Sequence, residues 1–113
     1  ADINSKDRYG RTRLHQAVRF YSEENAVLLL TRKANINARD REGNTPLHIA
    51  VDCQYLNAVQ LLLAHGADPN LHNDDEYTPL MMAALKNNHA IVKALLNAGA
   101  MPNLPGYQGK CPL

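Results

Sequence analysis

One short pattern recurs along this chain at a constant distance, and it constrains the fold more than any other feature. The pattern Thr-x-Leu-x-x-Ala occupies Thr12–Ala17, Thr45–Ala50 and Thr78–Ala83, each copy 33 residues after the last, and Cys111–Leu113 opens a fourth, altered copy after the same interval. A fixed interval of this length is typical of chains built from stacked, equal units. The sequence therefore predicts a repeat array.

Other residues return at the same interval. The columns are Ala1, Ala34, Ala67 and Ala100; Asn4, Asn37, Asn70 and Asn103; Asp7, Asp40 and Asn73; and Gly10, Gly43 and Gly109, with Glu76 as the exception. The columns agree without a single insertion, which makes chance similarity untenable. The units then span residues 7–39, 40–72 and 73–105, and residues 106–113 begin a further one.

The central copy, Thr45-Pro46-Leu47-His48-Ile49-Ala50, and its interval resemble the ankyrin-repeat family. The resemblance covers essentially the whole chain. It implies an all-α ankyrin-repeat solenoid of antiparallel helix pairs joined by β-hairpin-like loops, with residues 1–113 as a single domain. Because the chain starts and stops part-way through a unit, we expect a fragment of a longer array that is only marginally stable alone.

Local signals place two helices in each unit. Thr45 is a good N-cap and Pro46 suits the first helical position, so a first helix is expected over about 46–55. A second is expected over about 57–65, where apolar residues recur at helical spacing, with Gly66 as the left-handed residue that ends it. The same layout predicts helices at about 13–21, 23–32, 79–87 and 89–98.

Composition is that of an ordinary folded protein. Hydrophobic residues make up 45% and charged residues 20% of the chain. No apolar run reaches the length of a membrane span, and the two cysteines, Cys53 and Cys111, are expected to be reduced thiols. We therefore expect a cytoplasmic or nuclear protein with no membrane contact.

Charge is unevenly distributed although the net charge is only +1. Residues 1–45 carry nine Lys and Arg against six Asp and Glu, a net +3, whereas residues 46–113 carry three against five, a net −2. A nucleic-acid-binding surface usually needs a strongly basic face. The gradient instead favours a protein partner bound in one orientation.

Candidate catalytic and metal-binding residues are few. His15 and His48 each follow a threonine at fixed spacing; the family resemblance assigns them a structural role, bonding the threonine hydroxyl and the backbone of the loop, and Met81 replaces this histidine in the third unit. The remaining histidines, His65, His72 and His89, lack the i, i+3 or i+4 spacing of metal ligands on a helix.

Two further groups leave alternatives open. The consecutive acids Asp74, Asp75 and Glu76 are typical of a solvated loop tip, but an ion site or a contact to a basic partner remains open. Cys53, expected on an exposed part of its helix, has no basic neighbour in sequence to make it reactive. No phosphate-binding loop or nucleophile motif is present, so we predict no enzymatic activity, no cofactor and no metal.

Partner binding is expected at positions that vary between repeats while the framework stays constant. By the family's cupped-hand arrangement, the loop-tip positions are Arg8, Tyr9, Arg11, Arg41, Glu42, Asn44, Asp74, Asp75 and Tyr77, and the concave helix positions are Arg19, Phe20, Asp52, Cys53, Leu85 and Lys86. Aromatic residues and arginine dominate interface energetics, so Arg19, Phe20, Tyr9 and Tyr77 form a candidate anchor set. The alternative for Phe20 and Tyr21 is packing over the end of the array.

Ankyrin resemblance also suggests a modification. Asparagines of this column are sometimes hydroxylated by a cytosolic oxygen-dependent dioxygenase in the family. Asn70 and Asn37 each have a leucine eight residues upstream, and Asp68 adds to the match for Asn70. We expect Asn70 to be the better candidate.

The function expected from this sequence is non-catalytic protein–protein interaction through the loop tips and the concave helix face, as a scaffold, regulatory adaptor or inhibitor. A substrate-docking segment of a larger enzyme, such as a ubiquitin ligase or modifying enzyme, is the main alternative, and a purely structural spacer is another. We expect a monomeric domain that binds a protein, and neither nucleic acid nor a small-molecule substrate.

Overall fold

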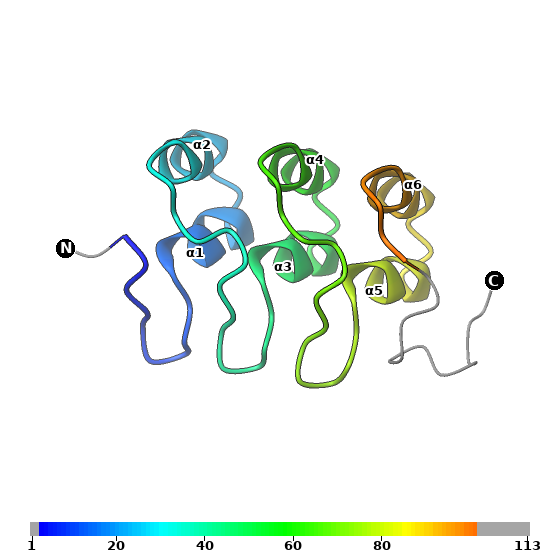
Figure 1. Cartoon of the computed structure of the whole chain (residues 1–113), viewed down its shortest axis with the longest axis horizontal. Coiled ribbons are helices and arrows are strands. Elements are labelled where there is room, and N and C mark those ends of the chain that lie inside the picture. The colour runs from blue at the N-terminus through cyan, green and yellow to red at the C-terminus, as the bar shows by residue number, and fades with distance from the viewer. Residues whose placement is uncertain (1–2, 102–113) are drawn as a thin grey trace.

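Three helix pairs stand side by side along an elongated molecule of 44 × 25 × 20 Å (Figure 1). The computed structural model describes residues 3–101. The helices are α1 (Arg13–Arg19), α2 (Glu23–Thr31), α3 (Pro46–Asp52), α4 (Leu56–Ala64), α5 (Pro79–Leu85) and α6 (His89–Asn97). The expected all-α solenoid of antiparallel helix pairs is confirmed. The fourth unit, expected at 106–113, lies outside the described residues.

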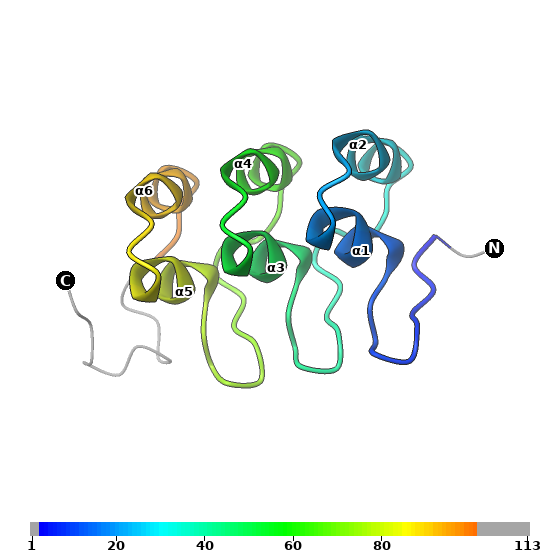
Figure 2. The same ribbon diagram turned by 180° about the vertical axis from the view of Figure 1, so that it is seen from behind.

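The helices form two layers, with the connecting loops projecting from one side (Figure 2). We call α1, α3 and α5 the inner helices and α2, α4 and α6 the outer helices. Within each unit the two helices pack together, and α3 packs between α1 and α5. Leu14, Leu47 and Leu80 fill one core column, each 1% exposed, and Ala50 is fully buried, so neighbouring inner helices approach closely.

The inner helices begin as the sequence predicts. Thr12, Thr45 and Thr78 are N-caps whose hydroxyls accept from backbone N–H groups of the first turn. Ser22 is also an N-cap, of α2, but its side chain makes no capping hydrogen bond. That helix relies on Glu23 and Glu24 in its first turn, at the positive end of the helix dipole.

The helix ends differ from the sequence expectation. Inner helices stop at Arg19, Asp52 and Leu85, two or three residues earlier than expected, and outer helices stop one residue earlier. The cause is a left-handed residue after every helix, which reverses the chain: Tyr21, Gln54 and Asn87 follow the inner helices, and Lys33, Gly66 and Gly99 the outer ones. Only two of these six residues are glycine, and both follow outer helices, so no glycine marks the ends of the inner helices in the sequence.

Each of these ends has the hydrogen bonds of a Schellman motif. After α3, the N–H of Gln54 donates to Val51 O at 3.0 Å and that of Tyr55 to Ala50 O at 2.9 Å. Gly66 adopts φ +91° as expected. Lys33 occupies the equivalent place after α2 with φ +65°, a left-handed conformation that costs a residue with a side chain about 1 kcal/mol.

Three tight loops, which we call finger loops 1, 2 and 3 (residues 7–11, 40–44 and 73–77), carry the variable tips. In finger loop 2, Asp40 Oδ1 accepts from the N–H groups of Glu42 and Asn44, both at 2.9 Å. Asp7 and Asn73 make the same two bonds in the other loops. The repeated Asp/Asn column therefore fixes the backbone of each tip.

Neighbouring finger loops are also joined to each other. Arg41 N–H donates to Tyr9 O at 3.1 Å, and Asp74 N–H to Glu42 O at 2.9 Å. At Gly43, φ is +77°, and a Cβ there would lie 2.6 Å from Asp74 Oδ1 and 2.7 Å from Asp74 N. Glycine is required at this position both by the left-handed backbone and by the approach of the next loop.

Candidate functional site

The two repeated histidines connect each inner helix to the finger loop of the following unit. His48 Nδ1 lies 3.1 Å from Thr45 N and 2.8 Å from Thr45 Oγ1, and His48 Nε2 lies 2.8 Å from Tyr77 O. His15 makes the same contacts to Thr12 and to Asn44 O. A backbone N–H can only donate and a carbonyl can only accept, so the ring is neutral with its proton on Nε2.

Burial fixes this protonation state. Both rings are 0% exposed. Desolvation lowers the pKa of His48 to about 4, against the opposing effect of its bond to Tyr77 O, and it lowers the pKa of His15 in the same way. Neither ring has a free nitrogen for proton transfer, so the expected structural role agrees with the geometry.

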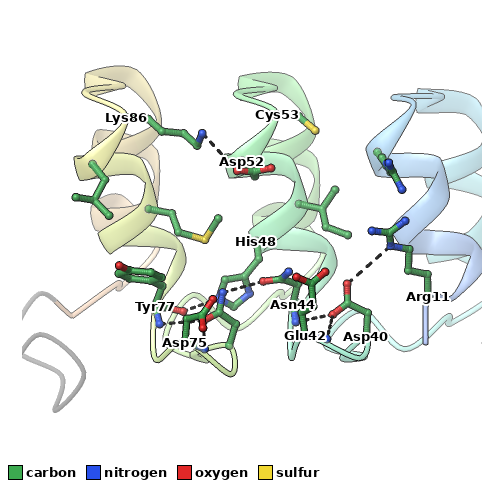
Figure 3. A pocket seen from close by; sticks show the side chains of 15 residues that line it. Arg11, Asp40, Glu42, Asn44, His48, Asp52, Cys53, Asp75, Tyr77 and Lys86 are labelled. Carbon is green, nitrogen blue, oxygen red and sulfur yellow. Dashed lines mark hydrogen bonds and ion pairs between the residues drawn. The ribbon is translucent and has the colours of Figure 1, made fainter. Parts of the chain in front are cut away.

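The inner helices and the finger loops enclose a groove (Figure 3). Its cavity measures about 620 Å³ and runs across all three described units. The finger loops contribute Arg11, Glu42, Asn44, Asp75 and Tyr77, and the inner helices and their caps contribute Arg19, Asp52, Cys53, Leu85 and Lys86. These ten side chains, all among the predicted partner-binding residues and drawn from separate segments of the sequence, are part of the fifteen that line one cavity.

Seven of the groove's lining residues are charged, and four of these are paired. Lys86 Nζ lies 3.3 Å from Asp52 Oδ1, and Arg11 Nε lies 3.9 Å from Asp40 Oδ2. Within residues 3–101, no ion pair involves the other three, Arg19, Glu42 and Asp75. The groove thus offers one positive and two negative charges that a ligand could neutralise.

Comparison with family models decides the classification. One model described as ankyrin repeats (3 copies) matches residues 1–73, and another described as ankyrin repeats (many copies) matches residues 54–96. The chain belongs to the ankyrin-repeat family. Ankyrin repeats generally mediate protein–protein interaction. No curated protein matches the chain significantly.

Five of the fifteen predicted partner-binding residues do not line the ankyrin groove. Arg8, Tyr9, Arg41 and Asp74 lie at exposed tips of the finger loops, with Tyr9 contacted by the guanidinium groups of Arg8 and Arg11 at 5.5 and 5.4 Å from the ring centre. Phe20, 72% exposed, borders a second hollow of about 1210 Å³ between α1, α2 and residues 3–7. The expected anchor set is therefore divided among three places: Arg19 and Tyr77 line the groove, Tyr9 lies at a finger-loop tip and Phe20 borders the second hollow.

Five groove residues were missed by the sequence analysis: Asp40, His48, Ile49, Asn73 and Met82. Asp40, His48 and Asn73 recur or nearly recur at the 33-residue interval, so the sequence analysis assigned them to the framework. Ile49 and Met82 vary in their column, where the first unit has Gln16, so the criterion of variability should have found them. The sequence alone does not show that Ile49 and Met82 lie on the side of their helices that faces the finger loops.

Cys53 is half-buried at the C-cap of α3 and lies in the groove, so the expectation that it sits on an exposed part of the helix is wrong. Burial raises the pKa of its thiol, and Asp52 adds to the effect. The cysteine is therefore protonated at neutral pH and a poor nucleophile.

Phe20 and its neighbour Tyr21 have different environments. Tyr21 is half-buried and stacks on Tyr55 of the next ankyrin unit, with ring centres 5.4 Å apart. Phe20 contacts the guanidinium group of Arg19, 5.5 Å from the ring centre, and is otherwise exposed. Packing is thus the role of Tyr21, whereas Phe20 has the exposure that an anchor needs.

The repeated asparagines link successive loops. Asn37 Oδ1 accepts from Asp68 N–H at 3.0 Å, and Asn70 Oδ1 accepts from Met101 N–H at 2.8 Å. Asn70 Nδ2 also donates to Gly99 O at 3.3 Å. Both side chains are half-buried. Asn103, the next in the column, lies outside the described residues.

Other candidate chemistry finds no support in the described part of the chain. Residues 3–101 contain no group of three or more His, Cys, Asp or Glu side chains arranged to hold a metal ion. Asp74, Asp75 and Glu76 are all exposed at finger loop 3. None of the helices there is long and apolar enough to cross a membrane.

Proposed function

We propose that this chain is a non-catalytic module that binds a partner protein through its groove and finger loops, as a scaffold, regulatory adaptor or inhibitor in the cytoplasm or nucleus. The observation that carries the proposal is the contrast within each repeat. Buried columns such as the leucine at 14, 47 and 80 are identical, whereas groove columns such as Arg19, Asp52 and Leu85 change in charge and polarity. A stack needs the first set for stability, and a specific binder needs the second.

The domain is proposed to act as a monomer. The imidazole of His48 is neutral with both ring nitrogens hydrogen-bonded, and the thiol of Cys53 is protonated, so neither group is set up for catalysis. Binding without chemistry is the activity that these groups support.

Photocrosslinking from matched positions tests this function. The photoreactive residue p-benzoylphenylalanine replaces Leu85, exposed in the groove, or Leu96, exposed on α6. We expect one protein to be crosslinked in cell extract from position 85 but not from 96, and unlabelled wild-type chain to compete for it. Equal crosslinking from both positions, or none that competes, contradicts binding through the groove.

We also propose that Asn70 is a better substrate for asparagine hydroxylation than Asn37. The sequence around Asn70 supports this choice, because Leu62 lies eight residues upstream of it and Asp68 two residues before it, whereas Asn37 has only the upstream leucine, Leu29. Mass spectrometry of chain coexpressed with the dioxygenase should show one added oxygen on the Asn70 peptide. An unmodified Asn70, or greater modification of Asn37, contradicts the proposal.

A further inference from the structure

We infer that the groove is built for an extended segment of the partner in which an apolar residue beside a lysine or arginine sits over the second and third units, with an acidic residue toward the first. The inference rests on the proposed function and adds to it the chemistry and direction of the bound segment. It follows from which charges in the groove are already neutralised and from where its apolar surface lies.

The unpaired charges are ordered along the array. Arg19 lies in the first unit, Glu42 on finger loop 2 and Asp75 on finger loop 3, and all three line the cavity. Asp52 and Asp40 already have cationic partners in Lys86 and Arg11 and gain little from a second cation. A bound segment therefore gains most by placing a cation near Glu42 and Asp75 and an anion near Arg19.

Apolar surface is concentrated in the same half as the unpaired acids. Leu85 is 66% exposed, Tyr77 is 38% exposed, and Ile49 and Met82 form part of the wall beside them. The first unit has Gln16 and Arg19 in the columns of Met82 and Leu85. An apolar side chain is therefore best covered next to the position that favours a cation.

The two acids are held on fixed backbone. Glu42 donates its N–H to Asp40 Oδ1 and its carbonyl accepts from Asp74 N–H, and Asp75 donates to Asn73 Oδ1. Their carboxylates are exposed and make no hydrogen bond within residues 3–101. A ligand cation thus meets acceptors on a backbone that needs no reordering, which lowers the entropic cost of binding.

Selection from random peptides tests the inference on the whole 113-residue chain. Peptides of about 12 residues reach roughly 40 Å when extended, comparable with the 44 Å length of the molecule. We expect the selected peptides to be enriched in an apolar residue adjacent to lysine or arginine, with an acidic residue on one consistent side. The affinity of the best peptide is then measured for the variants described next.

The Glu42→Lys/Asp75→Lys variant should weaken that peptide at least about tenfold. Replacing the peptide's lysine or arginine by glutamate should restore most of the loss. Glu24→Lys on α2 reverses one acidic charge away from the groove and should have little effect on peptide affinity, although the loss of a first-turn acid should lower the melting temperature slightly. Because Glu42 and Asp75 carry no structural side-chain bonds, the melting temperature of the double variant should remain close to that of the wild type.

A third variant, Leu85→Asn, separates the inference from the function on which it rests. Peptides that are weakened by Leu85→Asn but not by the charge reversal would overturn the proposed partner chemistry and leave groove binding intact. Peptides insensitive to both changes, or the absence of any selected peptide, would overturn the inference. In that case the competed crosslink from position 85 decides whether the groove still binds a folded partner.

Discussion

Lowering the pH from 7 to 5 should destabilise this protein through His48. The ring is fully buried, and its Nδ1 accepts from both the N–H and the hydroxyl of Thr45. Protonation of Nδ1 removes that acceptor and places a charge in the core. The folded state therefore resists protonation, which is why burial lowers the pKa of His48 to about 4.

The direction and size of this change in stability follow from the difference between the folded and unfolded pKa values of His48. The folded pKa is depressed below the unfolded value of about 6.5, so the stabilisation is fully present above that value and is lost as the pH falls toward 4. At pH 5 the loss from His48 alone is about 2 kcal/mol, rising to about 3 kcal/mol below pH 4. A domain of this size has a total stability of roughly 5–15 kcal/mol, so the change is readily measured.

Urea unfolding followed by helical circular dichroism measures the effect. The control is His48→Met, which installs the residue that the third unit carries at the equivalent position 81. The variant should be less stable at pH 7 by about 1–3 kcal/mol, because Tyr77 O loses its donor and Thr45 its partner. Between pH 7 and 5, however, it should lose about 2 kcal/mol less than the wild type does.

Two results would refute the reasoning. Equal loss of stability in wild type and His48→Met would show that the pH dependence arises elsewhere. A wild type that keeps its stability at pH 5 would show that the ring titrates normally, which an NMR titration of its Cε1 proton would reveal directly. His15, whose pKa is lowered for the same reason, should preserve part of the pH dependence in the variant.

Substitutions at four further positions test the backbone and the surface. Gly66→Ala should lower the free energy of unfolding by about 1 kcal/mol because of its left-handed φ alone, since no atom lies near its added Cβ. Gly43→Ala should lower it by about 2 kcal/mol more, because its Cβ meets the next finger loop. Chemical denaturation measures both changes. Lys33→Gly should raise the stability by about 1 kcal/mol, with Lys33→Ala giving no such gain. Phe20→Ala should leave the melting temperature unchanged, because the ring is 72% exposed. If Phe20 is an anchor, the same change should weaken partner binding by more than about 2 kcal/mol. A lower melting temperature would instead indicate that Phe20 packs against the domain.

The sequence predicted the framework because framework residues repeat. Thr45, Pro46 and Leu47 have the roles in capping and core packing that their columns indicated. The inner-helix ends were placed too late because the left-handed residues there are Tyr21, Gln54 and Asn87, and a side chain in that conformation gives no composition signal comparable to glycine. At these inner-helix ends, the strained residues are held by the surrounding hydrogen bonds of the Schellman motifs, which the sequence does not show.

The groove was predictable in part, because positions that vary stand out against the repeated framework. Variable positions identified ten of its residues, but variability does not report which way a side chain faces. Phe20 varies as its neighbours do yet borders the hollow near α2, whereas the variable Ile49 faces the groove and was overlooked. Ion pairing was equally hidden: Asp52 and Lys86 are 34 residues apart in sequence and meet only through the stacking of α3 on α5.

The way in which Asp7, Asp40 and Asn73 bind each finger loop bears on how such a protein changes during evolution. These side chains accept from the backbone N–H groups of the residues two and four places later, such as Glu42 and Asn44, and not from their side chains. A tip residue such as Glu42 can therefore be replaced by any residue except proline without disturbing these bonds, whereas Gly43 beside it must remain glycine. Mutation can exchange one binding preference for another at these positions while the conformation that presents them is inherited unchanged.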